Sequence, residues 1–256
     1  IRCLRSINKL YLVPDIKIKI IVVDNSNKHV SFKPVQKLKK SLKYKVIQLH
    51  EKKRGVVYAR NKCLRELKKI NPKFTCFFDD DCVVDRNWLK NVFKTIKFTN
   101  AEIVTGPQLP LKKKYLNSSK FINYSQFFEK KYKENLKRVS WAASNNVFLK
   151  YDIIIRHKLF FDKALNKFGI GEDQLFFLKL HGYGHTIYWS KTVKVFEDIH
   201  KHRLNLKWLI QRSFRLGVLG HYIDMSIHGK LLGFIINYLK SIYYFAKTFS
   251  YIFLFF

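Results

Sequence analysis

An apolar segment that ends in three consecutive carboxylates is the feature that most constrains this chain. Residues 74–78 read Phe-Thr-Cys-Phe-Phe, as a buried strand does, and Asp79, Asp80 and Asp81 follow directly. Hard cations such as Mg²⁺ and Mn²⁺ prefer oxygen ligands, and they often bind through one or two carboxylates together with substrate phosphates. The pattern therefore predicts a divalent-cation site, with Asp79 and Asp81 on one side of a strand. The alternative is a solvated acidic turn whose Asp caps the next helix.

The composition describes a globular chain with a strongly basic balance. Its 256 residues are enough for one sizeable core, and 47% of them are hydrophobic, which argues against disorder. The formal net charge of +32 suits nucleic acid, a phosphorylated small molecule or an anionic membrane. Because the lysines are spread along the whole chain, a background codon bias explains the positive charge equally well. The charge does not choose among these partners.

The cysteines and the first residues bear on the cellular compartment. Cys3, Cys63, Cys76 and Cys82 form no Cys-x-x-Cys pair and have no matching His cluster, so zinc is not expected. Their apolar surroundings predict buried thiols in a reducing, cytoplasmic compartment. No signal peptide pattern is present, and the chain begins in an amphipathic helix without a starting Met. We therefore expect that an upstream piece is missing.

Strands and helices are predicted to alternate along the first half of the chain. The predicted strands are residues 17–24, 44–49, 74–78 and 101–105, and the predicted helices are residues 1–10, 55–70 and 85–93. This order predicts an α/β fold with a largely parallel central sheet and helices on its faces. Ligands bind beyond the carboxyl ends of such strands, so Asp24 and the three acids at 79–81 are expected to converge on one edge.

The second half is less regular. Residues 111–137 predict a loop with a helix near 121–135, and residues 138–149 read as extended. Gly171-Glu172-Asp173 opens an amphipathic helix that continues to Gly182. Acidic side chains at the amino end of a helix interact favourably with its dipole, which is a purely structural explanation for this pair.

Four ordered segments resemble family 2 glycosyltransferases with the GT-A fold. They are Val-Val-Asp-Asn at 22–25, Gly-Val-Val-Tyr-Ala-Arg-Asn at 55–61, the acidic segment at 78–89, and Phe161-Asp162 with Gly171-Glu172-Asp173. Residues 197–217 also resemble the segment that follows the catalytic helix in bacterial members. The similarity covers residues 1–217, and residues 218–256 are expected to form a helical, apolar extension.

The resemblance implies a metal-dependent transfer of a sugar from a nucleoside-diphosphate sugar. Asp79 and Asp81 would hold Mn²⁺ or Mg²⁺ on the diphosphate, and Asp80 would support them among the nucleotide-sugar-binding residues. Asp24 would read the nucleotide base, and Arg60 would lie near the base or the diphosphate. The metal would orient the diphosphate and neutralise the charge that builds on it.

The resemblance also implies the acceptor side of the reaction. Asp173, beside Glu172, would be the general base that takes a proton from a hydroxyl of a glycan or lipid-linked acceptor. A single displacement of this kind inverts the anomeric centre. Small residues precede Asn146, as the family pattern has them, so Asn146 is expected to contact a sugar.

One departure from the family keeps other functions open. Members begin with a strand and a Pro-Thr-Tyr-Asn-like loop that contributes to nucleotide binding, whereas this chain begins in the helix that should follow. A GT-A-like interaction protein that has lost catalysis and associates with membranes is one alternative. A basic nucleic-acid-binding protein is another, but it leaves the acids at 79–81 unexplained and shows no recognition motif.

The carboxyl-terminal segment at 231–256 is rich in Leu, Ile, Phe and Tyr, and Lys240 and Lys247 interrupt it. Its uncharged runs are shorter than the roughly 20 residues that span a bilayer. We expect a helix that lies in an anionic membrane surface on the cytoplasmic side, with its lysine heads reaching the lipid phosphates. The alternative is a helix that packs on protein.

Overall fold

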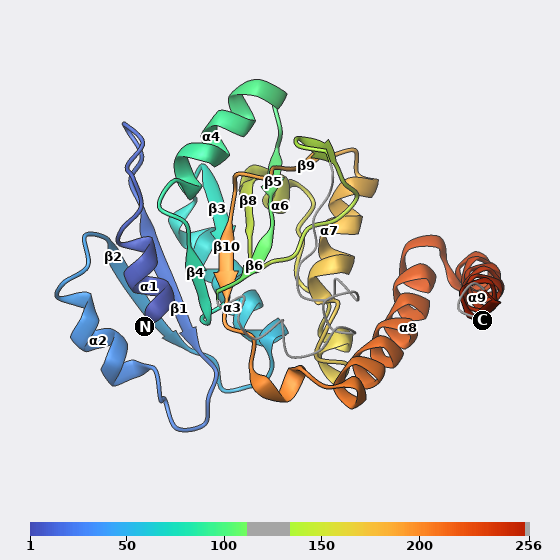
Figure 1. The fold of residues 1–256 in the computed structure, drawn as a ribbon. Helices are drawn as coiled ribbons and strands as arrows, with labels where there is room; N and C mark the ends of the chain where they lie inside the picture. The colour runs from blue at the N-terminus through green and yellow to red at the C-terminus, as the bar shows by residue number, and fades with distance from the viewer. Residues whose placement is uncertain (112–133, 254–256) are drawn as a thin grey trace. The chain divides into compact units, whose positions relative to one another are not determined.

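The computed structural model describes residues 1–111 and 134–253, with side chains up to residue 248. These residues belong to two compact units, Ile1–Asn205 and Leu206–Phe256 (Figure 1). The boundary expected after residue 217 falls within a helix of the second unit. The loop and helix predicted for residues 111–137 fall mostly outside the described residues.

The first unit opens with the elements that the sequence predicts, and one more. They are α1 (Arg2–Ile7), β1 (Lys19–Asp24), α2 (Phe32–Lys39), β2 (Lys45–His50), α3 (Val56–Ile70) and β3 (Phe74–Phe77). Helix α2 was not predicted, because its one buried residue, Val35, leaves no apolar period to detect. Helix α3 starts at Gly55, where φ is 127° and an added Cβ would lie 1.7 Å from Oδ1 of Asn166. This position therefore requires glycine.

Further elements follow in the described part of the first unit. They are β4 (Cys82–Val84), α4 (Trp88–Thr99), β5 (Ile103–Thr105), β6 (Gln108–Pro110), β7 (Lys137–Arg138), β8 (Val147–Lys150), α6 (Asp152–Arg156), the 3₁₀-helix η2 (Lys163–Lys167), α7 (Glu172–Gly182), β9 (Ile187–Trp189), β10 (Val195–Glu197) and the 3₁₀-helix η3 (Lys201–Arg203). The predicted helices after Asp85 and Gly171 and the strand at 101–105 are confirmed.

The three acids at 79–81 lie in a turn, so the prediction that they sit on a strand is wrong. Strand β3 ends at Phe77, and β4 begins at Cys82. The backbone N–H of Cys82 donates to the carbonyl of Asp79 at 3.2 Å, which closes the turn. The side-to-side alternation of a strand therefore does not govern Asp79 and Asp81.

The strand pairing confirms the α/β class and shows mixed directions. The described strands form three sheets, with the orders β1-β2, β4-β10-β6 and β3-β8-β5-β9-β7. The pairs β1 with β2, β6 with β10 and β5 with β9 are parallel. Strand β8 runs antiparallel between β3 and β5, which gives the five-stranded sheet its mixed character.

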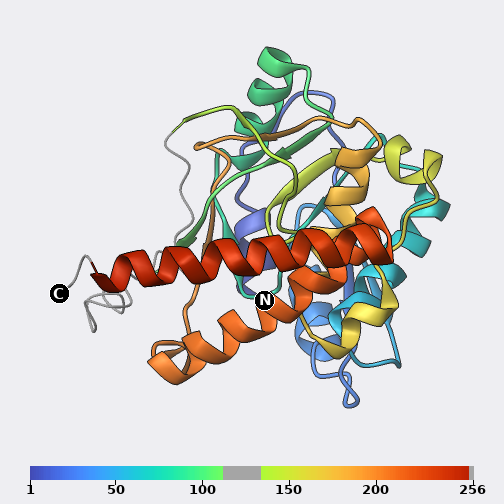
Figure 2. The same cartoon turned by 90° about the vertical axis from the view of Figure 1, so that its right-hand side faces the viewer.

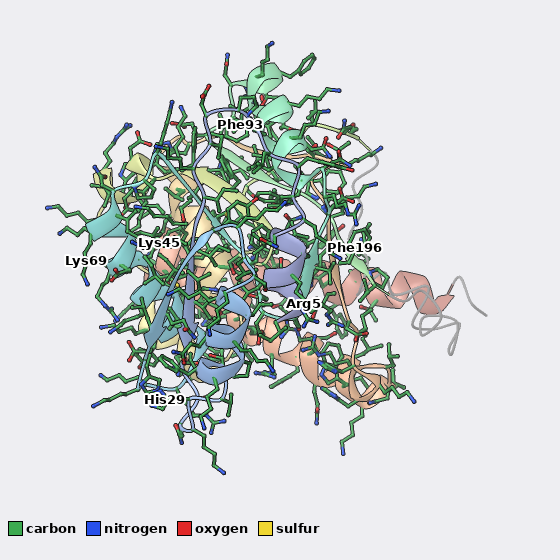
Figure 3. All side chains as sticks on the ribbon, turned by 90° about the vertical axis from the view of Figure 1, so that its left-hand side faces the viewer. Arg5, His29, Lys45, Lys69, Phe93 and Phe196 are labelled. Atoms are coloured by element: carbon green, nitrogen blue, oxygen red, sulfur yellow. The ribbon has the colours of Figure 1, made fainter. Side chains whose placement is uncertain are left out.

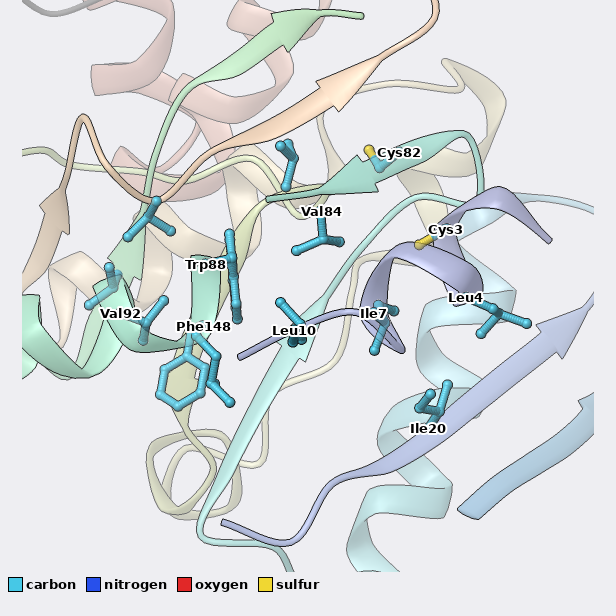
Figure 4. Packing of buried hydrophobic residues seen from close by; sticks show 14 of the residues in the cluster. Cys3, Leu4, Ile7, Leu10, Ile20, Cys82, Val84, Trp88, Val92 and Phe148 are labelled. Carbon is cyan, nitrogen blue, oxygen red and sulfur yellow. The ribbon is translucent and has the colours of Figure 1, made fainter. Parts of the chain in front are cut away.

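Two buried clusters cover the two faces of the five-stranded sheet. Phe148 packs in the cluster that also contains α1, β1 and α4, while its neighbours Val147 and Leu149 pack with α3 and α7. Successive residues of a strand point to opposite faces, so one short strand supplies both clusters. Figure 4 shows Cys3, Leu4 and Ile7 of α1 in the first cluster. This packing holds α1 against β4, next to the acidic turn.

Basic side chains extend into solvent from separate elements of the first unit (Figure 3). Lys45 of β2 and Lys69 of α3 are exposed examples, and Lys69 pairs with Glu66 of its own helix at 2.9 Å. The dispersal agrees with the even spread of lysines in the sequence.

The second unit consists of α8 (Leu206–His228) and α9 (Lys230–Phe253), and α9 is one long, continuous helix (Figure 2). The helices approach closely at Gly233, where an added Cβ would lie 2.5 Å from Cα of Met225. Asp224 is buried, and both of its carboxylate oxygens accept from Nζ of Lys240 at 2.8 Å. Within the described residues, we find no helix with the length and apolar character that crossing a membrane requires.

Candidate active site

Arg60 connects the acidic turn to the start of α7. Its Nη2 donates to Oδ1 of Asp79 at 3.1 Å, and its Nη1 forms an ion pair with Oε1 of Glu172. The side chains of Arg60 and Glu172 are 11% and 6% exposed, whereas that of Asp79 is 42% exposed. The guanidinium also lies over the ring of Phe161, 5.6 Å from the ring centroid. Asp79 and Glu172, which are far apart in the sequence, thus share the buried guanidinium of Arg60.

The neighbouring Asn61 fixes the segment that leads to α7. Its Oδ1 accepts from the backbone N–H of Phe161 at 2.9 Å, and its Nδ2 donates to the carbonyl of the same residue at 2.8 Å. Asn61 is 1% exposed. Because these two bonds leave little freedom, the Phe161 ring is held beneath the guanidinium of Arg60.

Asp173 stands at the amino end of α7 and is partly exposed. Its Oδ2 accepts from the backbone N–H of Ser144 at 3.2 Å, and its Oδ1 accepts from the backbone N–H of Gln174 at 2.8 Å. The carboxylate is therefore oriented by backbone groups while solvent still reaches it. Glu172, next to it, is buried and bonded to Arg60.

The charges of this group are strongly coupled. Burial and the adjacent Asp173 raise the pKa of Glu172, and Arg60 opposes them. Burial raises the pKa of Asp79 as well, with Arg60 again opposing and with Asp81 and Asp173 adding to the rise. One guanidinium does not balance this many carboxylates, so an additional cation would stabilise the ionised site.

A second set of charged residues, at the end of β10 and just after it, lies near Asp81. Strand register places Glu197 opposite Cys82, and Glu197 forms an ion pair with Arg203 at 3.0 Å. Burial and Asp80 raise the pKa of Asp81, and Arg203 is among the groups that lower it. Burial and Asp81 likewise raise the pKa of Glu197.

Arg2 is a residue of this region that sequence reasoning missed. Its Nη2 donates to the backbone carbonyl of Asp81 at 3.2 Å, and its Nη1 pairs with Asp198 at 3.2 Å. Only the packing of α1 against β4 brings it there, and no local pattern at the start of the chain indicates it. Ser144 was likewise missed as a partner of Asp173, although it precedes the predicted Asn146.

Asp24 organises the loop that follows β1. Its Oδ1 accepts from the backbone N–H and the hydroxyl of Ser26 at 2.8 and 2.6 Å, and its Oδ2 accepts from the same two groups of Ser31 at 2.8 and 2.7 Å. Burial alone would raise the pKa of Asp24, but these four bonds outweigh it and hold the pKa well below its usual range. Asn25 then donates to the carbonyl of Gly55 at 2.7 Å, which ties this loop to the helix that carries Arg60.

Asn146 occupies a structural position, which argues against the predicted sugar contact. It is 1% exposed, and its Oδ1 accepts from Nε1 of Trp88 at 2.7 Å. Its Nδ2 donates to the carbonyls of Pro107 and Val193 at 3.2 and 2.8 Å. Both amide hydrogens are thus used inside the core, and the side chain links three segments of the fold.

The acidic turn has the chemistry of an open cation site. Asp79 and Asp81 are partly exposed and Asp80 is exposed, so carboxylate oxygens are available to a hard cation. Within the described ranges, we find no group of three or more His, Cys, Asp or Glu side chains arranged to hold a metal. These residues fit a site in which the protein supplies one or two ligands and other oxygens complete the coordination.

Comparison with known proteins identifies the class. The model of glycosyl transferase family 2 matches residues 1–157, and the chain belongs to this family. It is therefore a glycosyltransferase, as the resemblance implied.

Individual relatives agree with this assignment. The chain is 28% identical over 233 residues to the succinoglycan biosynthesis protein ExoM of Rhizobium meliloti strain 1021, which covers 90% of this chain and 70% of ExoM. Among solved structures, residues 1–349 of S. aureus TarS match with a TM-score of 0.60 at 19% identity, over 88% of this chain and 60% of that one. The complex of TarS with UDP-GlcNAc matches with a TM-score of 0.61 at 18% identity, over 88% of this chain and 61% of that one. At this identity the structures establish the fold alone.

Proposed function

We propose that this glycosyltransferase is inverting and metal-dependent and that it uses a nucleoside-diphosphate sugar. The observation that carries the proposal is the bridge formed by Arg60 between Asp79 and Glu172. It brings the acidic turn and the partly exposed Asp173 to the two sides of one buried guanidinium. A donor with its leaving group at the turn and its anomeric carbon facing Asp173 suits this arrangement.

Asp79 and Asp81 would hold Mn²⁺ or Mg²⁺, with exposed Asp80 beside them. The cation would neutralise negative charge on the departing diphosphate. Oδ1 of Asp79 accepts a hydrogen bond from Arg60. Asp81 would therefore be the main ligand of the cation, and Asp79 would interact with both the cation and Arg60. Asp24 orders the loop that follows β1, and this loop would lie close to the nucleotide.

Asp173 would act as the general base. Its carboxylate takes the proton of the acceptor hydroxyl while that oxygen forms the new bond to the anomeric carbon. The bond from this carbon to the diphosphate breaks at the same time, and the nucleoside diphosphate leaves with the electron pair. Glu172 is less suited to the task, because it is buried and paired with Arg60.

The relatives narrow the proposed substrates. ExoM is named for succinoglycan biosynthesis, and TarS has been solved with UDP and with UDP-GlcNAc. We propose a uridine-diphosphate sugar as the donor and a hydroxyl of a growing, lipid-linked glycan as the acceptor. The likeness to TarS covers 60% of that chain, so its substrates serve only as a guide to the test.

The helical unit from residue 206 onward supports a proposal of peripheral binding to an anionic membrane on the cytoplasmic side. Residues 206–256 contain six Lys and Arg but one acid, Asp224. Large apolar side chains are exposed along α9, and they include Leu231, Phe234, Tyr238, Leu239, Ile242 and Phe245. Apolar side chains together with basic ones suit a lipid surface. Lys240 is paired with Asp224, which corrects the expectation that all the lysine heads in this segment reach lipid phosphates.

A release assay tests the proposed activity. Purified protein is incubated with Mn²⁺, a glycan primer and UDP-glucose, UDP-galactose or UDP-N-acetylglucosamine, and free UDP is measured. We expect release that EDTA stops and that Asp173→Asn slows sharply, while Asp152→Asn, an exposed acid of α6, behaves as wild type. Release that is unaffected by EDTA would refute the metal dependence. No release, combined with retention on a DNA column that fades with salt, would favour the nucleic-acid-binding alternative.

A further inference from the structure

Two histidines face each other at the end of the five-stranded sheet that lies away from the acidic turn. Nε2 of His157 is 2.9 Å from Nε2 of His185, and Nδ1 of His185 is 2.8 Å from Oε2 of Glu102. Strands β3 and β5 are each antiparallel to β8, and β5 is parallel to β9, so these three strands run in one direction. Glu102 and His185 precede β5 and β9, whereas the acidic turn follows β3. The histidine pair and the proposed active site therefore lie at opposite ends of the sheet.

Both imidazole rings are held in place by the fold. His157 follows the last residue of α6, and its ring stacks on that of Tyr183, with the centroids 4.1 Å apart and the planes 5° from parallel. His185 is 6% exposed, and its backbone N–H donates to the carbonyl of Leu180 in α7 at 3.1 Å. The convergence of the two Nε2 atoms thus depends on α6, α7 and the loop before β9.

Glu102 determines which nitrogen of His185 carries the lone pair. An ionised carboxylate only accepts hydrogen bonds, so Nδ1 of His185 must donate to it. Nε2 of the neutral ring is then the acceptor, and its lone pair points toward His157. A carboxylate that accepts from the second ring nitrogen is the usual neighbour of a metal-binding histidine, because it fixes the tautomer and the ring orientation. His185 is therefore prepared to bind a metal through Nε2.

The distance between the two Nε2 atoms suits a particular class of metal ion. Bonds from a divalent transition metal to imidazole are about 2.0–2.1 Å long, so two nitrogens at a right angle around the ion lie about 2.9 Å apart. Tetrahedral ligands would lie about 3.3 Å apart. Right angles are typical of Ni²⁺ and Cu²⁺, which imidazole suits. His157 is partly exposed, so its ring can turn until both lone pairs meet at the ion.

We infer that His157 and His185 form a second metal site, which takes a divalent ion of the Ni²⁺ and Cu²⁺ class, with Glu102 as the residue that positions His185. On binding, the proton on Nε2 of His157 moves to Nδ1, so both Nε2 atoms can bind the ion without loss of a proton. No group of three or more candidate ligands gathers in the ranges that the structure describes, so water would complete the coordination.

An ion in this position would tie the end of α6 to the loop before β9. Its expected effect is therefore on stability, and the inference does not depend on the proposed function. A protein that releases no UDP from any donor could still bind Ni²⁺ between these histidines.

Calorimetry with Ni²⁺ provides the first test, on the full chain without a histidine tag. Asp81→Ala serves as the parent, so that the proposed site at the acidic turn does not contribute. We expect one equivalent of Ni²⁺ to bind the parent and to be lost when His157→Gln is added. His181→Gln is the matched control, because His181 is an exposed histidine of α7 outside the pair. No binding by the parent, or equal losses in the two histidine variants, would overturn the site.

Glu102→Gln tests the positioning role. The amide oxygen can still accept from Nδ1 of His185, but the negative charge is gone, and Ni²⁺ affinity should fall about 10–100-fold, as for other neighbours of metal ligands. An unchanged affinity would refute the role of Glu102.

Thermal unfolding measures the effect of the ion on stability. Ni²⁺ at 100 times its dissociation constant should raise the thermal midpoint of the wild type by about 5–10 °C, and that of His157→Gln much less. Equal shifts in both proteins would contradict the site.

A crystal of the wild type soaked in Ni²⁺ gives a test that does not depend on how well any variant folds. Anomalous scattering at the nickel absorption edge locates the ion. We expect a peak about 2.1 Å from both Nε2 atoms. Peaks confined to other histidines would show that the pair is only a hydrogen-bonded link between α6 and the sheet, and the inference would fail.

Discussion

Arg60 and Asp79 are nineteen residues apart in the chain, and their side chains meet at 3.1 Å. Arg60 of helix α3 also pairs with Glu172 of α7, so one guanidinium joins α3, the acidic turn after β3 and α7. Asp79, which is proposed to share a metal ion with Asp81, is thus already paired with the guanidinium of Arg60. Changes at Asp79 should disturb both the fold and the proposed metal site, whereas changes at Asp81 should disturb the metal site alone.

Asp81→Ala should abolish metal-dependent binding of the nucleotide sugar, because a diphosphate does not hold Mn²⁺ in place without a carboxylate anchor from the protein. Asp79→Ala should be nearly as severe and should also lower the urea midpoint, since it removes a partner of buried Arg60. Calorimetry with and without EDTA measures the first effect, and a urea titration measures the second. Wild-type metal-dependent affinity in the Asp81 variant would refute its assignment as a ligand.

Asp173→Asn should leave donor affinity within a few fold and lower turnover by roughly 10²–10⁴, the range for loss of a positioned base. Asn keeps the shape of the side chain and can accept from one of the two backbone N–H groups that Asp173 accepts from, so the fold should persist at a cost of about 1 kcal/mol. Initial rates of UDP release, together with calorimetry, separate the two effects. A larger rate loss in Glu172→Gln than in Asp173→Asn would transfer the role of base to Glu172.

Arg60→Ala should destabilise the protein by about 3–5 kcal/mol, because buried Glu172 loses its partner. Arg65→Ala on the same helix is the matched control. Arg65 is 47% exposed in its pair with Glu51, and an exposed pair contributes only about 0–1 kcal/mol. Urea unfolding measures both changes. Equal, small losses in the two variants would mean that the buried ion pair of Arg60 is not formed.

Asp24 should contribute to stability at neutral pH and lose that contribution in acid. Its hydrogen bonds to Ser26 and Ser31 hold the pKa below the ordinary value of 3.8, so the unfolded chain binds the proton more readily than the folded one. The stability of wild type over Asp24→Asn should be fully present above pH 3.8 and should decline as the pH falls through and below it. Urea unfolding at a series of pH values gives the difference. A difference that stays constant with pH for Asp24→Asn would contradict the account.

The protein should bind anionic vesicles through α9. Lys230 and Lys247 are exposed, and each basic residue near such a surface contributes about 1 kcal/mol, so replacing both with Gln should weaken binding about 30-fold. The matched control replaces the exposed pair Lys68 and Lys69 of α3 and should change little. Truncation after Gly229 should abolish binding, although it also deprives Asp224 of Lys240.

Flotation in low and high salt measures this binding, which should weaken as salt screens the charges. Binding that ignores lipid charge and resists carbonate extraction would indicate a membrane span, and no binding would indicate a helix that packs on protein.

Local pattern was sufficient for the family and for α1, β1, β2, α3, β3, α4, β5 and α7, whereas the short strands β4, β6, β9 and β10 were not predicted. The apolar runs before Asp24 and Asp79 and the breaker Asn71-Pro72 are short-range signals, and strands β1 and β3 and helix α3 follow them. The resemblance to family 2 glycosyltransferases rests on short motifs and on their order along the chain. Each motif consists of residues that are close in the chain, so the sequence alone reveals it. Periodicity does not reveal α2, which has a single buried residue.

Only the tertiary structure decided how the acids are used. Arg60 and Glu172 are 112 residues apart, and Arg2 and Asp81 are 79 apart, so no local rule pairs them. The reversal of the chain after Phe77 placed the acids in a turn, and the packing of Trp88 took Asn146 into the core. The sequence determined which residue types could carry the chemistry. Their burial, partners and pKa directions depend on neighbours from other elements, and only the packed fold supplies these.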